Sequence, residues 1–194
     1  TAAKKVKPMV MELGGKSPQI IFSDADIDLA VNGVASGIFP AAGQSCISGS
    51  RVLVHKSIEE EFVNKLVSIS KKAKVGDPLD PATQVGPIAN GPHYERVLQK
   101  IKEAELAGHK LLLDGRSFCR DKGYFIGPTI FNDVPNDSDL AQNEVFGPVL
   151  SIETWGSEQE VIRLANDSVY GLAAGIWTKD IAVAMRIADC IQAG

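Results

Sequence analysis

The stretch RVLVHKSIEEEFVNKLVSISKKA, residues 51–73, decides the fold class. Its first five residues, 51–55, form a short apolar run that is typical of a buried strand. Ser57 and Glu60 then have the spacing of a helix capping box, which predicts a helix over 58–73. The expected buried face of this helix consists of Ile58, Phe62, Leu66 and Ile69. A strand that leads directly into an amphipathic helix is the building unit of α/β domains.

The same alternation continues in both directions along the chain. We expect further strands at 19–22, 110–113, 128–131, 149–154 and 173–177. We expect further helices at 26–39, 93–107, 158–166 and 181–191, the third of them behind a second capping box at Ser157 and Glu160. The sequence therefore predicts an α/β fold with a mostly parallel sheet flanked by helices.

Composition limits the classes of function. The chain has 194 residues, 44% of them hydrophobic, a formal net charge of -4 and three cysteines. Such a charge is not that of a nucleic-acid-binding or membrane-surface protein, and three scattered cysteines make neither a disulfide framework nor a metal site. The uncharged segment 29–50 contains four glycines and Pro40, so we expect protein interior there and no membrane span. We expect a cytoplasmic protein, and because the chain starts at Thr1 and stops just after a helical pattern, a domain excised from a longer one.

One cysteine stands out. Cys46 lies in GQSCISGSR, residues 43–51, among glycines and hydroxyl residues that leave room for another molecule to approach. A lone cysteine is more often a small buried apolar residue than a nucleophile. That ordinary role is expected of Cys190, in the last helical pattern, whereas Cys119 lies in a charged loop. We accordingly expect Cys46 to be the one fast-reacting thiol.

A second unusual stretch is MELGGKSP, residues 11–18. Glu12 could be a surface charge paired with Lys16, or a carboxylate made more basic by a cleft of low polarity. The glycine pair that follows would let the backbone approach a flat ligand.

A third unusual stretch is NEVFGP, residues 143–148. In an extended segment Glu144 and Phe146 lie on the same side, where they could hold a ribose diol. The alternative is a turn that enters a strand, with Phe146 in the core.

Taken together, these stretches resemble the catalytic domain of the aldehyde dehydrogenase superfamily. The resemblance runs over 1–194, through MELGGKSP, FPAAGQSC, SGSR, EVFGPVL and YGLAAGIWT in the family's order and separation. It implies that the chain is this catalytic domain, with the family's dinucleotide-binding domain and C-terminal arm lying outside it.

The resemblance also implies roles for particular residues. Cys46 is implied to attack the aldehyde carbonyl, giving a thiohemiacetal and then a thioester, and Glu12 to activate the water that releases the acid. Leu13 is implied to lie beside the nicotinamide of NAD or NADP, and Glu144 and Phe146 to hold its ribose. No metal is implied. The parent enzyme is expected to oxidise an aldehyde to a carboxylic acid as a homodimer or homotetramer.

Some questions stay open at this point. The sequence has Ala41 and Ala42 where many members of the family carry an asparagine, which leaves the substrate subclass undecided. The isolated chain could also be a folded module without dehydrogenase activity, or a weak cysteine esterase.

Overall fold

The computed structural model describes residues 1–118 and 122–194. The strands are β1 (Pro18–Ile21), β2 (Arg51–His55), β3 (Lys110–Leu113), β4 (Thr129–Asn132), β5 (Val149–Trp155) and β6 (Gly175–Trp177). The α-helices are α1 (Ile27–Ile38), α2 (Glu59–Ser70), α3 (Gly91–Leu106), α4 (Asp139–Gln142), α5 (Glu158–Asn166) and α6 (Ile181–Ala188). Short 3-10 helices are η1 (Ala2–Lys5), η2 (Pro40–Gly43) and η3 (Gly115–Phe118).

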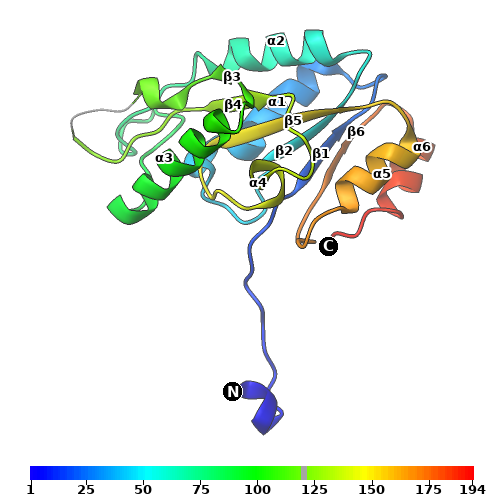
Figure 1. The fold of residues 1–194 in the computed structure, drawn as a ribbon, viewed down its shortest axis with the longest axis horizontal. Coiled ribbons are helices and arrows are strands. Elements are labelled where there is room, and N and C mark those ends of the chain that lie inside the picture. Colours follow the sequence, from blue (N-terminus) through cyan, green and yellow to red (C-terminus); the bar gives the residue numbers. More distant parts are fainter. Residues whose placement is uncertain (119–121) are drawn as a thin grey trace.

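The strands of the described residues form one twisted sheet in the order β3-β4-β5-β2-β1-β6 (Figure 1). Every neighbouring pair is parallel except β3 and β4, which are antiparallel at the edge. The predicted mostly parallel α/β sheet is therefore confirmed. Strands β2 and β5 pair so that Arg51 lies opposite Ser151, although these residues are far apart in the chain.

Each face of the sheet is covered by helices, as the alternation of side chains along a strand requires. Ile21, Val52 and Val54 point into the larger core with α1, α2 and α3, whereas Ile20 and Leu53 point to the opposite face. On that second face the sheet, including Trp155 of β5, packs against α5 and α6. The helix side chains in this cluster are Val161, Leu164 and Ala165 of α5 and Ile187 of α6. The expectation that residues 29–50 are interior holds only in part: four side chains of α1 lie in the larger core, whereas Leu29 and Ile47 are exposed. No helix of the described chain is both long and apolar enough to cross a membrane.

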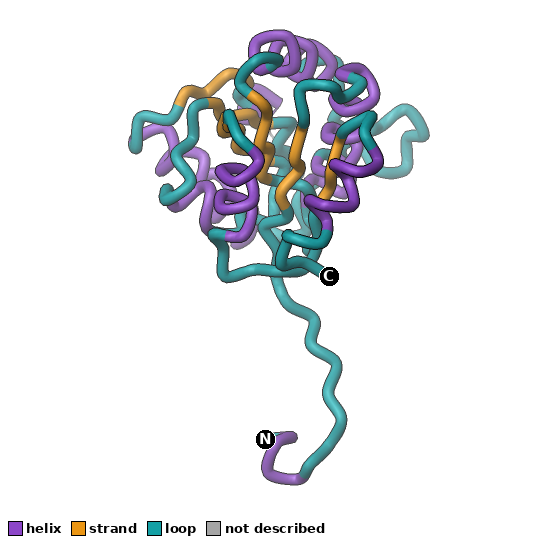
Figure 2. Tube along the Cα trace, turned by 90° about the vertical axis from the view of Figure 1, so that its right-hand side faces the viewer, coloured by secondary structure: helices purple, strands orange, loops and turns teal. Residues whose placement is uncertain are grey.

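The segment that precedes β1 runs away from this body (Figures 1 and 2). The segment begins with η1 and carries exposed apolar side chains: Val6 is 92% exposed and Val10 is 87% exposed. Only from Gly15 onward does the backbone become buried among the strands. Glu12 and Leu13 thus lie where the extended segment meets the body.

The predicted helices and strands all exist, with ends displaced by at most three residues. The short helix α4, just ahead of Glu144, was not predicted. One of the two capping boxes is confirmed: Ser157 accepts a hydrogen bond from Glu160 N at 3.3 Å. The other is wrong, because Ser57 Oγ bonds to His55 Nδ1 at 2.8 Å and α2 begins without a side-chain cap.

Candidate active site

The turn between α1 and β2 has an unusual backbone. After α1 ends, Ala41, Ala42 and Gly43 have φ angles of 52°, 52° and 69°. The left-handed region costs an L residue about 1–2 kcal/mol, so glycine fits it and the two alanines are strained. Strain of this kind persists only where surrounding contacts hold it, and it gathers at functional sites.

Gln44 makes such contacts. Its Nε2 donates to the carbonyl oxygens of Ala41 at 3.0 Å and Pro87 at 3.3 Å. Its Oε1 accepts from Ala89 N at 2.8 Å. One carboxamide therefore ties the left-handed turn to a loop more than forty residues further along.

Cys46 lies two residues beyond this carboxamide, in a tight turn where Ser48 N donates to Ser45 O at 3.1 Å. Its thiol is free and half-buried. Gly15 packs against it so closely that an added Cβ would overlap the Cys46 carbonyl oxygen. Because it has no side chain, Gly15 allows the backbone of the N-terminal segment to lie directly against the backbone of Cys46.

Glu12 and Leu13 are placed on the exposed face. The Glu12 side chain is exposed, so the described residues do not form a cleft of low polarity around it. The suggested pairing with Lys16 is wrong: Lys16 is 2% exposed and Glu12 is not among the ion pairs of the described chain. Leu13 is 62% exposed, as a residue that meets a ligand can be.

Glu144 follows α4 directly, and its carboxylate turns back toward the glycine pair. Its Oε1 accepts from Gly15 N at 3.0 Å, and an added Cβ at Gly14 would overlap Oε2. The Tyr170 ring flanks the same point, 3.3 Å from that added atom, and its hydroxyl lies 3.5 Å from Glu144 N. Oε2 receives no hydrogen bond within the described part of the chain. One carboxylate oxygen is thus fixed and the other is available.

Phe146 is held through its backbone. Its φ is 56° and its side chain is 38% exposed, so the alternative of a core phenylalanine is wrong. His93 Nε2, buried at the start of α3, lies 2.6 Å from the Phe146 carbonyl oxygen. A carbonyl only accepts, so His93 carries its proton on Nε2. This bond leaves the Phe146 ring at the surface.

The three stretches singled out in the sequence therefore meet in space. Gly15 contacts both Cys46 and Glu144, and an added Cβ at Gly43 would overlap the Gly147 carbonyl oxygen. These contacts join the N-terminal segment, the turn after α1 and the approach to β5. They place Cys46 and Glu144 on either side of one glycine.

An open groove borders this meeting point. It has a volume of about 460 Å³ and is lined by Met11, Leu13, Gly14 and residues 169–172. Gly14 contributes no side chain to its lining, Leu13 is exposed, and the Glu144 carboxylate lies against Gly14. A planar ring with an attached ribose fits this combination: close backbone approach for the ring and an acceptor for the diol.

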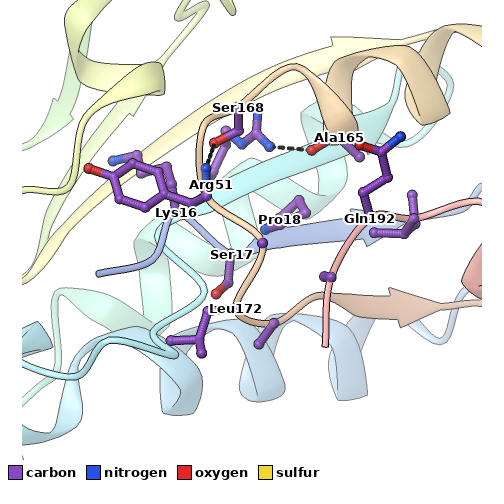
Figure 3. Close-up of a pocket in the computed structure, with 13 residues that line it drawn as sticks. Lys16, Ser17, Pro18, Arg51, Ala165, Ser168, Leu172 and Gln192 are labelled. Carbon is purple, nitrogen blue, oxygen red and sulfur yellow. Dashed lines mark hydrogen bonds between the residues drawn. The ribbon is translucent and has the colours of Figure 1, made fainter. Parts of the chain in front are cut away.

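Behind the glycine pair, Lys16 points into the interior. It lines a cavity of about 10 Å³ together with Ser17, Arg51 and Ser168, which is room for about one water molecule. Figure 3 draws the residues around this cavity. Lys16 Nζ has no hydrogen-bond partner among the described residues. The pKa of Lys16 is lowered to about 7, mainly because the side chain is buried and also because of the nearby Arg51 charge, whereas Glu144 and Asp139 act in the opposite direction. The Arg51 guanidinium instead bonds to Asn136 and to the carbonyls at 164 and 165.

Cys190 differs from expectation. Cys190 is exposed, not buried, because α6 ends at Ala188 and leaves it in the following turn. Exposure therefore does not single out Cys46 as the one reactive thiol. Cys119 lies outside the described residues.

Sequence reasoning did not find Gln44, His93 or Tyr170 as parts of this site. All three act through a few side-chain contacts with distant segments, which leave no periodicity in the sequence. Gln44 and Tyr170 do lie within the motifs GQSC and YGLAAG, and that placement was the available signal.

Known proteins resemble the chain over its full length. The model of the aldehyde dehydrogenase family matches residues 1–194. A betaine aldehyde dehydrogenase of Brucella anthropi is 47% identical over 198 residues, which cover all of this chain and 40% of that protein.

Solved structures agree with this match. An NAD-dependent aldehyde dehydrogenase from Sinorhizobium meliloti superposes with a TM-score of 0.96 at 41% identity, covering all of this chain and 38% of that one. An aldehyde dehydrogenase from Bacillus cereus, solved with NAD⁺, gives 0.95 at 40% identity over all of this chain and 39% of that one. The chain thus spans about two fifths of the length of these relatives. It belongs to the aldehyde dehydrogenase family.

Proposed function

We propose that this chain is the catalytic portion of an NAD- or NADP-dependent enzyme that oxidises an aldehyde to a carboxylic acid. The observation that carries the proposal is the contact of Gly15 with both Cys46 and Glu144. The glycine contacts the backbone carbonyl of Cys46, the residue of the candidate nucleophile, and donates from its N–H to Glu144, the candidate ribose acceptor. The family match supports the same assignment.

In the proposed reaction the Cys46 sulfur attacks the aldehyde carbon and forms a thiohemiacetal. Backbone N–H groups of the turn around Cys46 are suited to stabilise the oxyanion. Loss of hydride from that carbon leaves a thioester on Cys46. Glu12 takes a proton from water, which attacks the thioester, releases the carboxylic acid and restores the thiol.

The cofactor, when bound, supplies the hydride acceptor. Glu144 Oε2 and the exposed ring of Phe146 would hold its ribose, and Leu13 and the glycine pair would lie beside its nicotinamide. Glu144 is fixed in advance by Gly15 N, so binding does not have to order that carboxylate.

The substrate is proposed to be a small aldehyde. Betaine aldehyde comes first in a test panel, because the similar Brucella anthropi protein is named for it. The parent enzyme is proposed to be a cytoplasmic homodimer or homotetramer.

The test uses an enzyme of the relatives' full length that contains this chain. Glu12→Gln should keep a burst of reduced cofactor about equal to the number of active sites and block steady-state turnover, because Glu12 acts only after the thioester has formed. Cys46→Ala should abolish both. Loss of the burst in Glu12→Gln would move Glu12 to an earlier step, and a normal steady state would remove it from the mechanism.

A second candidate is cofactor-independent ester hydrolysis through Cys46. It needs only the half-buried thiol and the N–H groups of its turn, all of which the described residues supply. Hydrolysis of p-nitrophenyl acetate that Cys46→Ala removes, without any oxidation of aldehydes in the full-length enzyme, would favour it.

A further inference from the structure

The turn that carries Cys46 is unlike the other loops of the fold. Ala41, Ala42 and Gly43 are consecutive residues in the left-handed region, and two of them have side chains. Pro40 and the end of α1 fix the turn on one side, and β2 follows on the other. Contacts with other segments hold this conformation: Ala42 is buried in the larger core, and Gly43 packs against the carbonyl oxygen of Gly147.

The Gln44 side chain adds a further contact, in which both of its donors and one acceptor site bond to backbone groups. It donates to Ala41 O, inside the left-handed turn, and to Pro87 O, and it accepts from Ala89 N. Only a carboxamide can donate to two carbonyls and accept from an N–H at once. A carboxylate of the same shape loses both donors, and a thioether loses all three bonds.

The far end of this contact continues to the candidate ribose site. Asn90 follows Ala89 and caps α3 by accepting from His93 N at 2.9 Å. His93 in turn holds the Phe146 carbonyl. Gln44 is therefore connected to Phe146 through the hydrogen bonds of Ala89, Asn90 and His93 and the backbone that joins these residues.

We infer that Gln44 is a positioning residue that locks the left-handed turn and thereby fixes Cys46 relative to Phe146. The inference rests on the proposed role of Cys46 as nucleophile. Gln44 does not touch the reacting atoms. Its effect is to restrict the orientations of the thiol and of the N–H groups around it.

Breaking this lock has two opposite consequences. A half-buried thiol in a freed turn becomes more accessible, so a small alkylating reagent reacts with it faster. Acyl transfer needs the sulfur and the oxyanion donors in fixed positions, so it becomes slower. General destabilisation of the fold would produce the same two changes together with a lower free energy of unfolding, so the pair identifies a local release only where the free energy of unfolding is close to that of the wild type.

The test compares Gln44→Met and Gln44→Glu with Gln142→Met in the chain as it stands. Gln142 is a matched control, because its Nε2 also donates to two backbone carbonyls, Asn136 O at 2.6 Å and Asp167 O at 2.9 Å. Circular dichroism and urea unfolding first establish that each variant is folded. Iodoacetamide labelling is then followed by peptide mass spectrometry, with the exposed Cys190 as internal reference, and p-nitrophenyl acetate hydrolysis is corrected for the Cys46→Ala background.

Both Gln44 variants should label at Cys46 about threefold faster or more, and should hydrolyse the ester about tenfold more slowly or worse. Gln142→Met should change neither rate. Unchanged rates in both Gln44 variants, or equal changes in Gln142→Met, would overturn the inference. If Gln44→Met does not fold, Gln44→Glu decides, because it retains the bond from Ala89.

Failure of the proposed function is recognised separately. If the wild-type chain shows no ester hydrolysis that depends on Cys46, the nucleophile assignment has lost its support in this assay. Faster labelling of Cys46 in the Gln44 variants alone would then still establish the lock, and unchanged labelling would refute it.

Discussion

Gly15 lies against the backbone of Cys46 and has no room for a side chain. An added Cβ would overlap the Cys46 carbonyl oxygen, and rotating a side chain cannot relieve a clash with backbone. We expect Gly15→Ala to lower the free energy of unfolding by about 1–3 kcal/mol and to displace the turn of Cys46. Urea unfolding measures the first effect, and the labelling rate of Cys46 relative to Cys190 measures the second.

The control for this substitution lies within α1. An added Cβ at Gly37 meets nothing within 4 Å, and the residue is exposed near the end of the helix. Gly37→Ala should therefore raise the free energy of unfolding by about 0.5–1 kcal/mol and leave Cys46 labelling unchanged. Equal losses of stability at both glycines would show that the contact with Cys46 is not what requires Gly15.

Lys16 gives the fold a defined pH dependence. Burial lowers its pKa from 10.5 to about 7 in the folded chain. Between these two pH values the unfolded chain holds a proton on Lys16 that the folded chain has lost, so this residue makes stability rise as pH increases from about 7 to 10.5. At pH 7 and below, its cost to the fold is greatest.

Replacing Lys16 by methionine removes that cost. Lys16→Met should increase the free energy of unfolding at pH 7, and the gain should shrink at pH 9.5. Urea unfolding at both pH values gives the two differences from wild type. Lys72→Met, at an exposed position, should show no such change with pH. A gain of equal size at both pH values would contradict the account of Lys16.

Helix α5 depends on its cap more than α2 does. Ser157 accepts a hydrogen bond from Glu160 N, and Glu160 Oε2 accepts one from Gly156 N at 2.8 Å. Ser57 precedes α2 with the same sequence signature, but its hydroxyl is engaged by His55. Ser157→Ala should cost about 1 kcal/mol of stability, and Ser57→Ala about half of that or less. Thermal unfolding of the two variants tests this, and equal costs would count against the assignment of the caps.

These two serines show where sequence patterns stop being informative. Hydrophobic periodicity predicted α2 and α5 because burial of one face follows from spacing alone. The side-chain bonds at their ends depend on the path of the preceding strand, so identical spacing led to two different contacts. Likewise α4 has only four residues, too few to display a period. Cys190 was misplaced for a related reason: the apolar pattern continued past the point where α6 ends.

The candidate active site was likewise predictable from the sequence only in part. Cys46, Glu12 and Glu144 could be named from motifs, and the structure brings Cys46 and Glu144 against one glycine. The Gln44 lock and the His93 bond could not be predicted, because each joins segments more than forty residues apart through one or two atoms. Contacts of that kind depend on the arrangement of the sheet and its loops.

In the described part of the chain, burial differs between the central sheet and several of the candidate site residues. Both faces of its sheet are covered by helices, whereas Glu12 and Leu13 are exposed in the N-terminal segment, which runs away from the body (Figure 2). Phe146 is exposed as well. Burial of two apolar clusters is sufficient for a domain of this length to fold. We therefore expect the 194-residue chain to unfold cooperatively in urea.

The same chain should not oxidise aldehydes at ordinary cofactor concentrations. Its candidate cofactor contacts, through Leu13, Glu144 and Phe146, reach one ribose and the nicotinamide. Without contacts to the pyrophosphate and adenine the cofactor loses several kcal/mol of binding free energy, and each ~1.4 kcal/mol lowers affinity tenfold. Ester hydrolysis through Cys46 needs no cofactor, so it should remain. The measurement is absorbance of the reduced cofactor, with NAD or NADP and a panel of aldehydes that includes betaine aldehyde. Turnover that Cys46→Ala abolishes would contradict the prediction, and would mean that the groove beside Gly14 binds the nicotinamide end of the cofactor without help from the rest of it.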